Sequence, residues 1–247
     1  MSRRRSQFFG GNRQVAPRSN KNSKPASSGN DEIIDISHVT EQAHDFYAKH
    51  QKTILGILFG VVLLVGGYVS YKFLYIAPKE KSAIEAMYQA ENMFAKDSFA
   101  AALTNPGGGF DGFEAIIDNY SGTQTANTAK YYAGICNLNM GKFQEAIDYL
   151  EDYDACDDIT PAMKFGALGD AYSETGDLEK AEKLYEKASS ATKSEFLTPL
   201  YLNKLALLNF KNGKNEEALK HFQRIKDEFP LSTEARDAEK FVIRLGK

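Results

Sequence analysis

The clearest hydrophobic pattern in the chain is one uninterrupted run of uncharged residues near its N-terminus. The sixteen residues Ile54–Val69 carry no charge, and Lys52 and Lys72 flank the run. Counted over Thr53–Tyr71, the run holds 19 residues. At ~1.5 Å rise per residue, a helix of this length matches the ~30 Å hydrocarbon thickness of a bilayer. The sequence therefore predicts one transmembrane helix over residues 53–75.

Beyond this run, small and large apolar residues recur at intervals of 35 and then 37 residues, which Gly141, Gly176 and Gly213 mark. A period of this length indicates stacked helical hairpins. In the central unit, small residues stand where two antiparallel helices would approach each other, and large residues stand where successive hairpins would pack. The small residues are Gly169, Ala181 and Ala188, and the large ones are Phe165, Leu168, Tyr172 and Tyr185. We expect Gly176 to form the turn between the two helices.

The central unit resembles the tetratricopeptide repeat at all eight positions that we compared. Two flanking units follow the same pattern less closely, and Lys130, Asn137 and Asn209 are their departures from it. A fourth, degenerate repeat precedes them, because residues 113–120 (FEAIIDNY) resemble residues 222–229 (FQRIKDEF) at one constant offset.

The remaining elements follow from these repeats. We expect the first helix of the degenerate repeat over residues 79–103, and a loop over residues 105–109 (NPGGG) before its second helix. Residues 231–245 predict a closing helix with a charged outer face, as such stacks need. The sequence therefore predicts an all-α protein: a single transmembrane helix followed, over residues 79–247, by a tetratricopeptide-type α-solenoid. The solenoid has three clear repeats, one degenerate repeat and a C-terminal cap helix.

Charge is distributed unevenly about the predicted span. Residues 1–53 carry nine Lys/Arg and five Asp/Glu, a balance of +4, whereas residues 72–247 carry 21 and 28, a balance of −7. Cytoplasmic segments are enriched in Lys and Arg. We therefore expect the N-terminus to be cytoplasmic and the repeats to lie on the other side. The lysine counts next to the span are nearly even, so this expectation depends on the long tail.

The N-terminal segment divides into a tail, residues 1–36, and a short amphipathic stretch, residues 37–52. The tail is basic and has too few apolar residues to offset the entropy of ordering, so it is predicted to be disordered. It would meet either anionic lipid headgroups or a polyanion such as ribosomal RNA, where Phe8 or Phe9 would stack on bases. The sequence leaves both alternatives open.

No combination of residues predicts catalysis, a cofactor or a metal site. The acids are spread over predicted helix surfaces, and the motifs of nucleophilic, metal-dependent and phosphate-binding enzymes are missing. His38, His44 and His50 recur every six residues, whereas ligands on one helix face recur every three or four. The repeat pattern places Cys136 in the middle of a helix and Cys156 in a loop near the opposite end of the same hairpin, which argues against a disulfide. We therefore expect a protein that is not an enzyme.

Stacked hairpins curve, so that their first helices line a concave groove. The repeat pattern predicts a protein-binding groove lined by Tyr131, Ile135, Leu138, Asp170, Glu174, Leu207 and Phe210. Its ends would be apolar and its centre acidic, which suits an extended or helical segment of another protein. The alternative is that cap helices cover the apolar ends.

The predicted span carries a candidate contact of its own. Gly56 and Gly60 form a G-x-x-x-G pair. Two glycines at this spacing would let a partner helix approach the span closely, although glycine is also common in spans that are plain anchors.

The order of these parts resembles a known family: a basic tail, the stretch HVTEQAHDFYAKHQKT, one span and a tetratricopeptide domain that begins with a long helix. It looks like the ancillary subunit of the bacterial Sec translocon. The resemblance implies a single-pass protein of the inner membrane with periplasmic repeats. Its implied partners are the translocation channel and a periplasmic chaperone or secreted clients. The long basic tail departs from the shorter N-terminus of that family.

A second resemblance supports an alternative. The run F-P-x-S-x-x-A at residues 229–235 is similar to repeats in outer-membrane assembly and cell-division coordinators. The alternative function is therefore an inner-membrane envelope scaffold for cell-wall or outer-membrane assembly proteins. Those coordinators are soluble or lipid-anchored, whereas this chain carries a predicted protein span.

Overall fold

The computed structural model describes residues 36–105 and 107–246, and every regular element in these ranges is a helix. The tail that we predict to be disordered, with its lipid and RNA alternatives, lies outside the described residues apart from Ile36. The chain divides into two units, one ending at Phe59 and the other beginning at Gly60. The repeats all belong to the second unit.

Helix α1 (Ile36–Tyr71) contains the whole apolar run. Its large apolar side chains between Leu55 and Val69 are exposed in the structure. By length and composition, one helix of the described chain is apolar enough to cross a membrane, and none of its most apolar window is buried against protein. These side chains therefore do not pack into a hydrophobic core of the described chain.

The chain passes from α1 to the repeats without a loop. One π-helical turn, η1 (Lys72–Ile76), leads directly into α2 (Ala77–Phe94), which has Pro78 in its first turn. Proline has no backbone N–H to donate, and here it follows a π-helical turn that already interrupts the α-helical hydrogen-bond pattern. The end of α1 and the start of the repeat domain are thus one continuous helical segment.

The helix expected over residues 79–103 is broken in the structure, which corrects that prediction. Helix α2 ends at Phe94, and a separate helix α3 (Phe99–Thr104) follows after a turn. Asp97 adopts a left-handed conformation with φ of 56°, and Ser98 N donates to Met93 O at 3.0 Å. This turn folds α3 back beside α2. Asn105, also left-handed, then ends α3 at the predicted loop.

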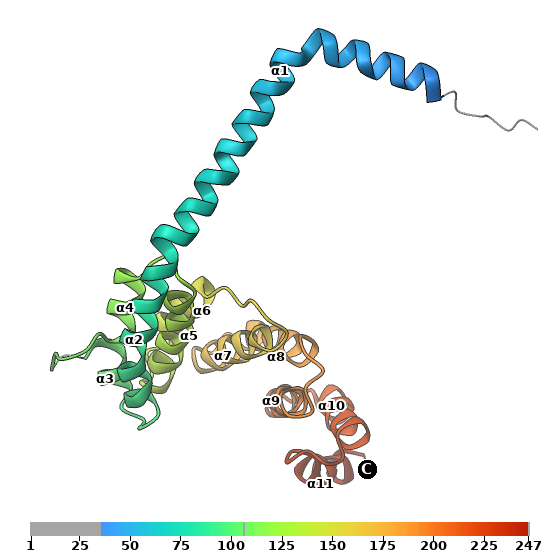
Figure 1. The fold of residues 1–247 in the computed structure, drawn as a ribbon. Helices are drawn as coiled ribbons and strands as arrows, with labels where there is room; N and C mark the ends of the chain where they lie inside the picture. Colours follow the sequence, from blue (N-terminus) through green and yellow to red (C-terminus); the bar gives the residue numbers. More distant parts are fainter. Residues whose placement is uncertain (1–35, 106, 247) are drawn as a thin grey trace, which may run out of the picture. The chain divides into compact units, whose positions relative to one another are not determined.

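The remaining helices are one that completes the degenerate repeat, then three consecutive antiparallel pairs, and a final helix. They are α4 (Phe113–Asn119), α5 (Gln124–Asn139), α6 (Phe143–Asp152), α7 (Thr160–Glu174), α8 (Leu178–Ser190), α9 (Leu197–Lys211), α10 (Asn215–Glu228) and α11 (Ala235–Leu245). The pairs α5–α6, α7–α8 and α9–α10 are the three clear repeats, and each packs on the next in chain order (Figure 1). The closing helix begins at Ala235 and not at the expected Leu231, which is almost fully exposed in the preceding loop.

The turns inside the three hairpins are built in the same way. Gly141, Gly176 and Gly213 have φ values of 74°, 84° and 77°, a left-handed conformation that side chains disfavour. In each turn the glycine N–H donates to the carbonyl three residues earlier. The expected turn at Gly176, and its equivalents, are therefore confirmed.

Small residues allow the helices to approach, as the pattern predicts. A Cβ atom added to Gly169 of α7 would lie 2.7 Å from Cδ1 and Cε1 of the Tyr185 ring in α8. A Cβ added to Gly134 of α5 would lie 2.6 Å from Cγ of Leu150 in α6. Glycine is required at both positions because a large residue of the partner helix occupies the space of a side chain.

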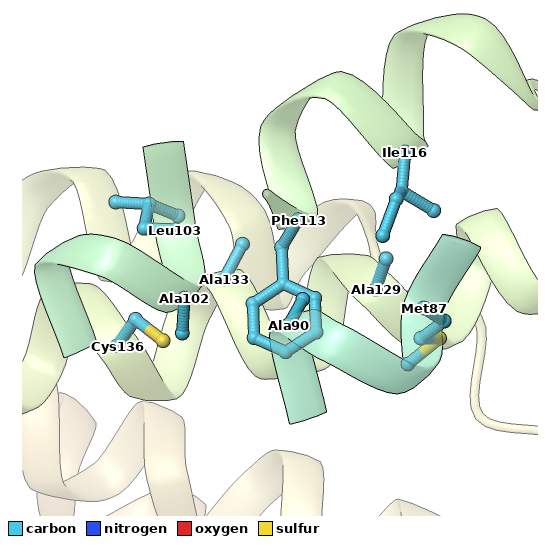
Figure 2. Close-up of a cluster of buried hydrophobic side chains, with 9 residues drawn as sticks. All are labelled: Met87, Ala90, Ala102, Leu103, Phe113, Ile116, Ala129, Ala133 and Cys136. Atoms are coloured by element: carbon cyan, nitrogen blue, oxygen red, sulfur yellow. The ribbon is translucent and has the colours of Figure 1, made fainter. Parts of the chain in front are cut away.

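The degenerate repeat has a core of its own, which Figure 2 shows. Phe113 of α4 is fully buried at its centre, between residues of α2, α3 and α5. The other members are Met87, Ala90, Ala102, Leu103, Ile116, Ala129, Ala133 and Cys136. The predicted second helix at residues 113–120 is thus present as α4, and α3 is an additional helix packed into the same repeat.

Candidate protein-binding surface

An open hollow lies between α2, α5 and α7, where the sequence predicts the N-terminal end of the groove. It has a volume of about 400 Å³. Its lining residues are Phe94, Thr128, Tyr131, Tyr132, Ile135, Tyr153, Thr160 and Met163. Two predicted groove residues, Tyr131 and Ile135, are among them. The lining carries no charged side chain, so the hollow suits an apolar group.

Aromatic rings form much of this wall and support one another. The Phe94 and Tyr132 rings meet edge to face with centroids 5.0 Å apart, and the Tyr132 ring stacks on Phe113 at 5.1 Å. The Tyr131 ring lies 5.5 Å from that of Tyr153. Such contacts stabilise ring pairs beyond their buried area. The wall is therefore anchored in the core of the degenerate repeat.

A second, smaller hollow of about 220 Å³ adjoins the first, because Thr128 lines both. Its other lining residues are Ile84, Met87, Glu91, Gln124 and Thr125. Beside it, the Ile84 and Tyr88 side chains of α2 are 58% and 62% exposed. Apolar side chains of this size gathered beside a hollow mark a candidate interaction surface. We call the lining residues of the two hollows together the α2–α5 groove.

The first turn of α2 holds α5 in place at the edge of this groove. The Glu80 carboxylate accepts hydrogen bonds from the backbone N–H of Gln124 at 2.7 Å and of Thr125 at 3.0 Å. The Thr125 hydroxyl donates to the same carboxylate at 2.6 Å. Lys79 Nζ donates to Ser121 O at 3.0 Å in the loop before α5. An anion at a helix N-terminus also interacts favourably with the helix dipole, so Glu80 joins α2 to α5.

The predicted acidic centre of the groove contains an internal ion pair. Lys204 Nζ of α9 lies 2.6 Å from Asp170 Oδ1 of α7, and both side chains are partly exposed. The Tyr185 hydroxyl of α8 donates to the same carboxylate at 2.8 Å. Glu174 is exposed at the end of α7. The Asp170 charge is therefore already paired with a cation of the next repeat.

The C-terminal end of the predicted groove is covered. Leu207 and Phe210 of α9 pack in one cluster with Phe241 and other apolar residues of α11. The Phe210 and Phe241 rings meet edge to face at 5.3 Å, and the Arg244 guanidinium lies over the Phe210 ring. The alternative that a cap helix covers an apolar end thus describes this end, whereas the α2–α5 groove is open.

The other predicted site residues lie away from both hollows. Leu138 is half-buried and packs with Ile147 and Leu168 in the core between the first two clear repeats. Gly56 and Gly60 lie on α1, and a Cβ added to either would meet no described atom within 4 Å. A partner helix would therefore find open space at both glycines.

Burial raises the pKa of one phenol and one thiol in this region. Burial, followed by the neighbouring Tyr201 and Tyr153, raises the pKa of Tyr131. Burial alone raises the pKa of the Cys136 thiol to about 12. Since a thiolate and not a thiol is the reactive form of cysteine, Cys136 contributes packing and not nucleophilicity. The groove offers shape and apolar surface.

A larger hollow, of about 690 Å³, lies elsewhere and has a mixed polar and apolar lining. It includes Asp118, Lys130, Asp152 and Cys156. Lys130 Nζ pairs with Asp152 Oδ2 at 2.6 Å across it. Unlike the α2–α5 groove, it is lined by several charged side chains, Asp154 among them, and its lysine is already paired. We therefore regard the smaller, apolar α2–α5 groove as the better candidate surface.

Sequence reasoning missed the contribution of α2 to the surface. Phe94 and Glu91 were outside the predicted groove, because the degenerate repeat does not match the pattern closely enough to align its first helix with α5. The contact of Glu80 with Thr125 joins residues 45 positions apart. A capping carboxylate supplied from another helix leaves no local sequence signal, since the usual capping residue lies within the same turn.

The comparisons with known proteins agree with this architecture. Residues 128–153 and 167–233 each match a family model described as tetratricopeptide repeat. No curated protein matches the chain. The stacked hairpins are tetratricopeptide repeats. Repeats of this class present extended surfaces on which other proteins bind, so the chain carries a protein-interaction module.

Proposed function

We propose that the protein holds a segment of another protein in the α2–α5 groove while α1 anchors it in a membrane. The observation that carries this proposal is the contrast between the two ends of the predicted groove. The hollow around Tyr131 and Met163 is open and apolar, whereas Phe210 at the other end is covered by α11. An open apolar surface beside exposed Ile84 and Tyr88 is the kind that partners cover.

The proposed topology is one span over residues 53–75 with the basic tail in the cytoplasm and residues 79–247 in the periplasm. Its support is the charge balance of +4 in residues 1–53 against −7 in residues 72–247. The amphipathic stretch at residues 37–52 would lie at the cytoplasmic surface. Because the repeat domain follows the span directly, it would lie close to the outer face of the inner membrane.

Protease accessibility tests this topology. Protease added to the periplasmic face of intact inner membranes is expected to degrade the repeat domain and to leave the tail attached to the span. Antibodies against residues 1–36 and against the repeats follow the two parts separately. Degradation of the tail with an intact repeat domain would reverse the proposed orientation.

The finer proposal is that the protein is an accessory subunit of the Sec translocon. The order of tail, span and repeats supports it, together with the open glycine pair at Gly56 and Gly60. In this role the span would contact the translocation channel, and the α2–α5 groove would hold a periplasmic chaperone or a secreted client. The tail would add a contact to anionic lipid or to the ribosome.

An inner-membrane envelope scaffold is the second candidate. One observation favours it: Leu231, within the F-P-x-S-x-x-A run, is 99% exposed in the loop between α10 and α11. An apolar side chain presented in this way could contact cell-wall or outer-membrane assembly proteins. The two candidates share the anchor and the repeats and differ in their partners.

Purification in mild detergent from the native membrane separates these candidates. The translocon proposal predicts that the channel co-purifies, that exchange of residues 53–75 for an unrelated span removes it, and that Thr128→Arg removes the periplasmic partner alone. Thr128 lines both hollows, so an arginine there would fill them. Thr175→Arg, on an exposed position of the same repeat array, is the matched control. Recovery of cell-wall or outer-membrane assembly proteins without the channel would favour the scaffold.

A further inference from the structure

Charge is sparse in the α2–α5 groove and has one sign. Among the described residues that line its two hollows, Glu91 is the only one with a carboxylate and none is basic. Glu91 is partly buried on α2 and lies beside the Tyr132 phenol, whose pKa is raised by burial and then by this carboxylate. The groove is therefore an apolar surface with one negative charge in it.

The carboxylates near this groove differ in what they already contact. Glu80 accepts three hydrogen bonds from the start of α5, and Asp170 is paired with Lys204. No ion pair joins Glu91 to a basic residue of the described chain. A partly buried carboxylate without a cation interacts more strongly with an incoming cation than one fully exposed to water does.

We infer that the occupant of the α2–α5 groove is an apolar peptide segment that carries a lysine or arginine, and that this cation pairs with Glu91. The inference rests on the proposed function and adds the chemistry of the partner. The aromatic and aliphatic lining accepts the apolar side chains. An anionic lipid headgroup would be repelled by Glu91, which makes a peptide the better complement of this surface.

The length of the groove limits the segment. Ile84 and Phe94, which line its two ends on α2, are ten residues apart. At ~1.5 Å per residue this separation corresponds to about 15 Å along the helix. A helical segment of about three turns, or an extended one of about five residues, spans that distance. The cation stands nearer the end of the segment that lies beside Phe94, since Glu91 is seven residues from Ile84 and three from Phe94.

Binding of matched peptides to the full chain in detergent micelles tests the inference. The probes are a library of ten-residue apolar peptides that vary in sequence. Each is made in three forms that carry lysine, norleucine or glutamate at one internal position that is nearer one end of the peptide. We expect lysine forms to bind the parent protein about tenfold more tightly than norleucine forms, because they gain a charge-assisted contact. Glu91→Gln is expected to remove this difference, and Glu91→Lys to shift the preference to the glutamate forms.

Glu85→Gln is the matched control, because Glu85 is exposed on the same helix and lines neither hollow. It is expected to keep the lysine preference. Equal binding of lysine and norleucine forms to the parent would overturn the inference. If the Thr128→Arg variant nevertheless lost binding of both forms, the groove would remain the binding surface and the proposed function would stand. Absence of binding by every library member would overturn the inference and the groove assignment together.

Discussion

Replacing Gly169 by leucine is expected to destabilise the central repeat by about 1–3 kcal/mol. The Tyr185 ring occupies the space that the new side chain would need, since even a Cβ would lie 2.7 Å from two of its ring carbons. If the ring moves, its hydroxyl leaves Asp170, which it meets at 2.8 Å. The variant therefore loses helix packing together with a contact that links α7 and α8. Chemical denaturation followed by circular dichroism measures the loss.

A double variant and a control variant identify the cause of this loss of stability. Gly169→Ala combined with Tyr185→Leu is expected to cost less than the sum of the two single changes, because the smaller leucine leaves room for the new methyl group. Glu174→Leu adds the same leucine at an exposed position of α7 and is expected to change stability little. If Gly169→Leu unfolded at the same denaturant concentration as the parent, the proposed packing of α7 on α8 would be incorrect.

The second large effect is expected for Glu80→Ala. The change removes three hydrogen bonds between α2 and the start of α5, and leaves the first N–H groups of α5 without that acceptor. We expect a loss of about 1–3 kcal/mol. The loss should be concentrated at the interface of α2 with α5. Hydrogen exchange of the full chain in detergent should show faster exchange in residues 77–94 and 124–139.

Glu85→Ala is the control for this prediction, because it removes an exposed carboxylate from the same helix without a described partner contact. It is expected to leave exchange in both helices unchanged. Equal exchange in Glu80→Ala and the parent would contradict the role that we assign to Glu80. Faster hydrogen exchange spread evenly over all repeats would show that Glu80 does not act specifically at the contact between α2 and α5.

The three clear repeats could be predicted from the sequence because their determinants are local and periodic. A positive φ at Gly176 and a close approach at Gly169 each require glycine, so the chemistry of the position appears directly in the residue. The membrane-spanning segment of α1 could be predicted for the same reason, because the length of its uncharged apolar run matches the thickness of a bilayer. Each of these features lies within about one turn or one hairpin of chain.

The features that could not be predicted have no local residue that requires them. The break after Phe94 follows from a left-handed Asp97, which aspartate tolerates but does not require. The cover over Phe210 comes from Phe241, and the contact between α2 and α5 comes from Glu80. Both join residues more than thirty positions apart. The repeat pattern therefore predicted Tyr131 and Ile135, which line the open hollow, whereas the cover over Phe210 and the contribution of α2 required the structure.

Photo-crosslinking in the native membrane tests the central claim most directly, that the α2–α5 groove holds another protein. A photoreactive amino acid is placed at Met163, which lines the groove, and separately at Lys183, which is exposed on α8. The account predicts one defined protein adduct from position 163 and none from position 183, with the adduct lost in Thr128→Arg. Adducts from position 183 without any from position 163, or an adduct at 163 that persists in Thr128→Arg, would contradict it.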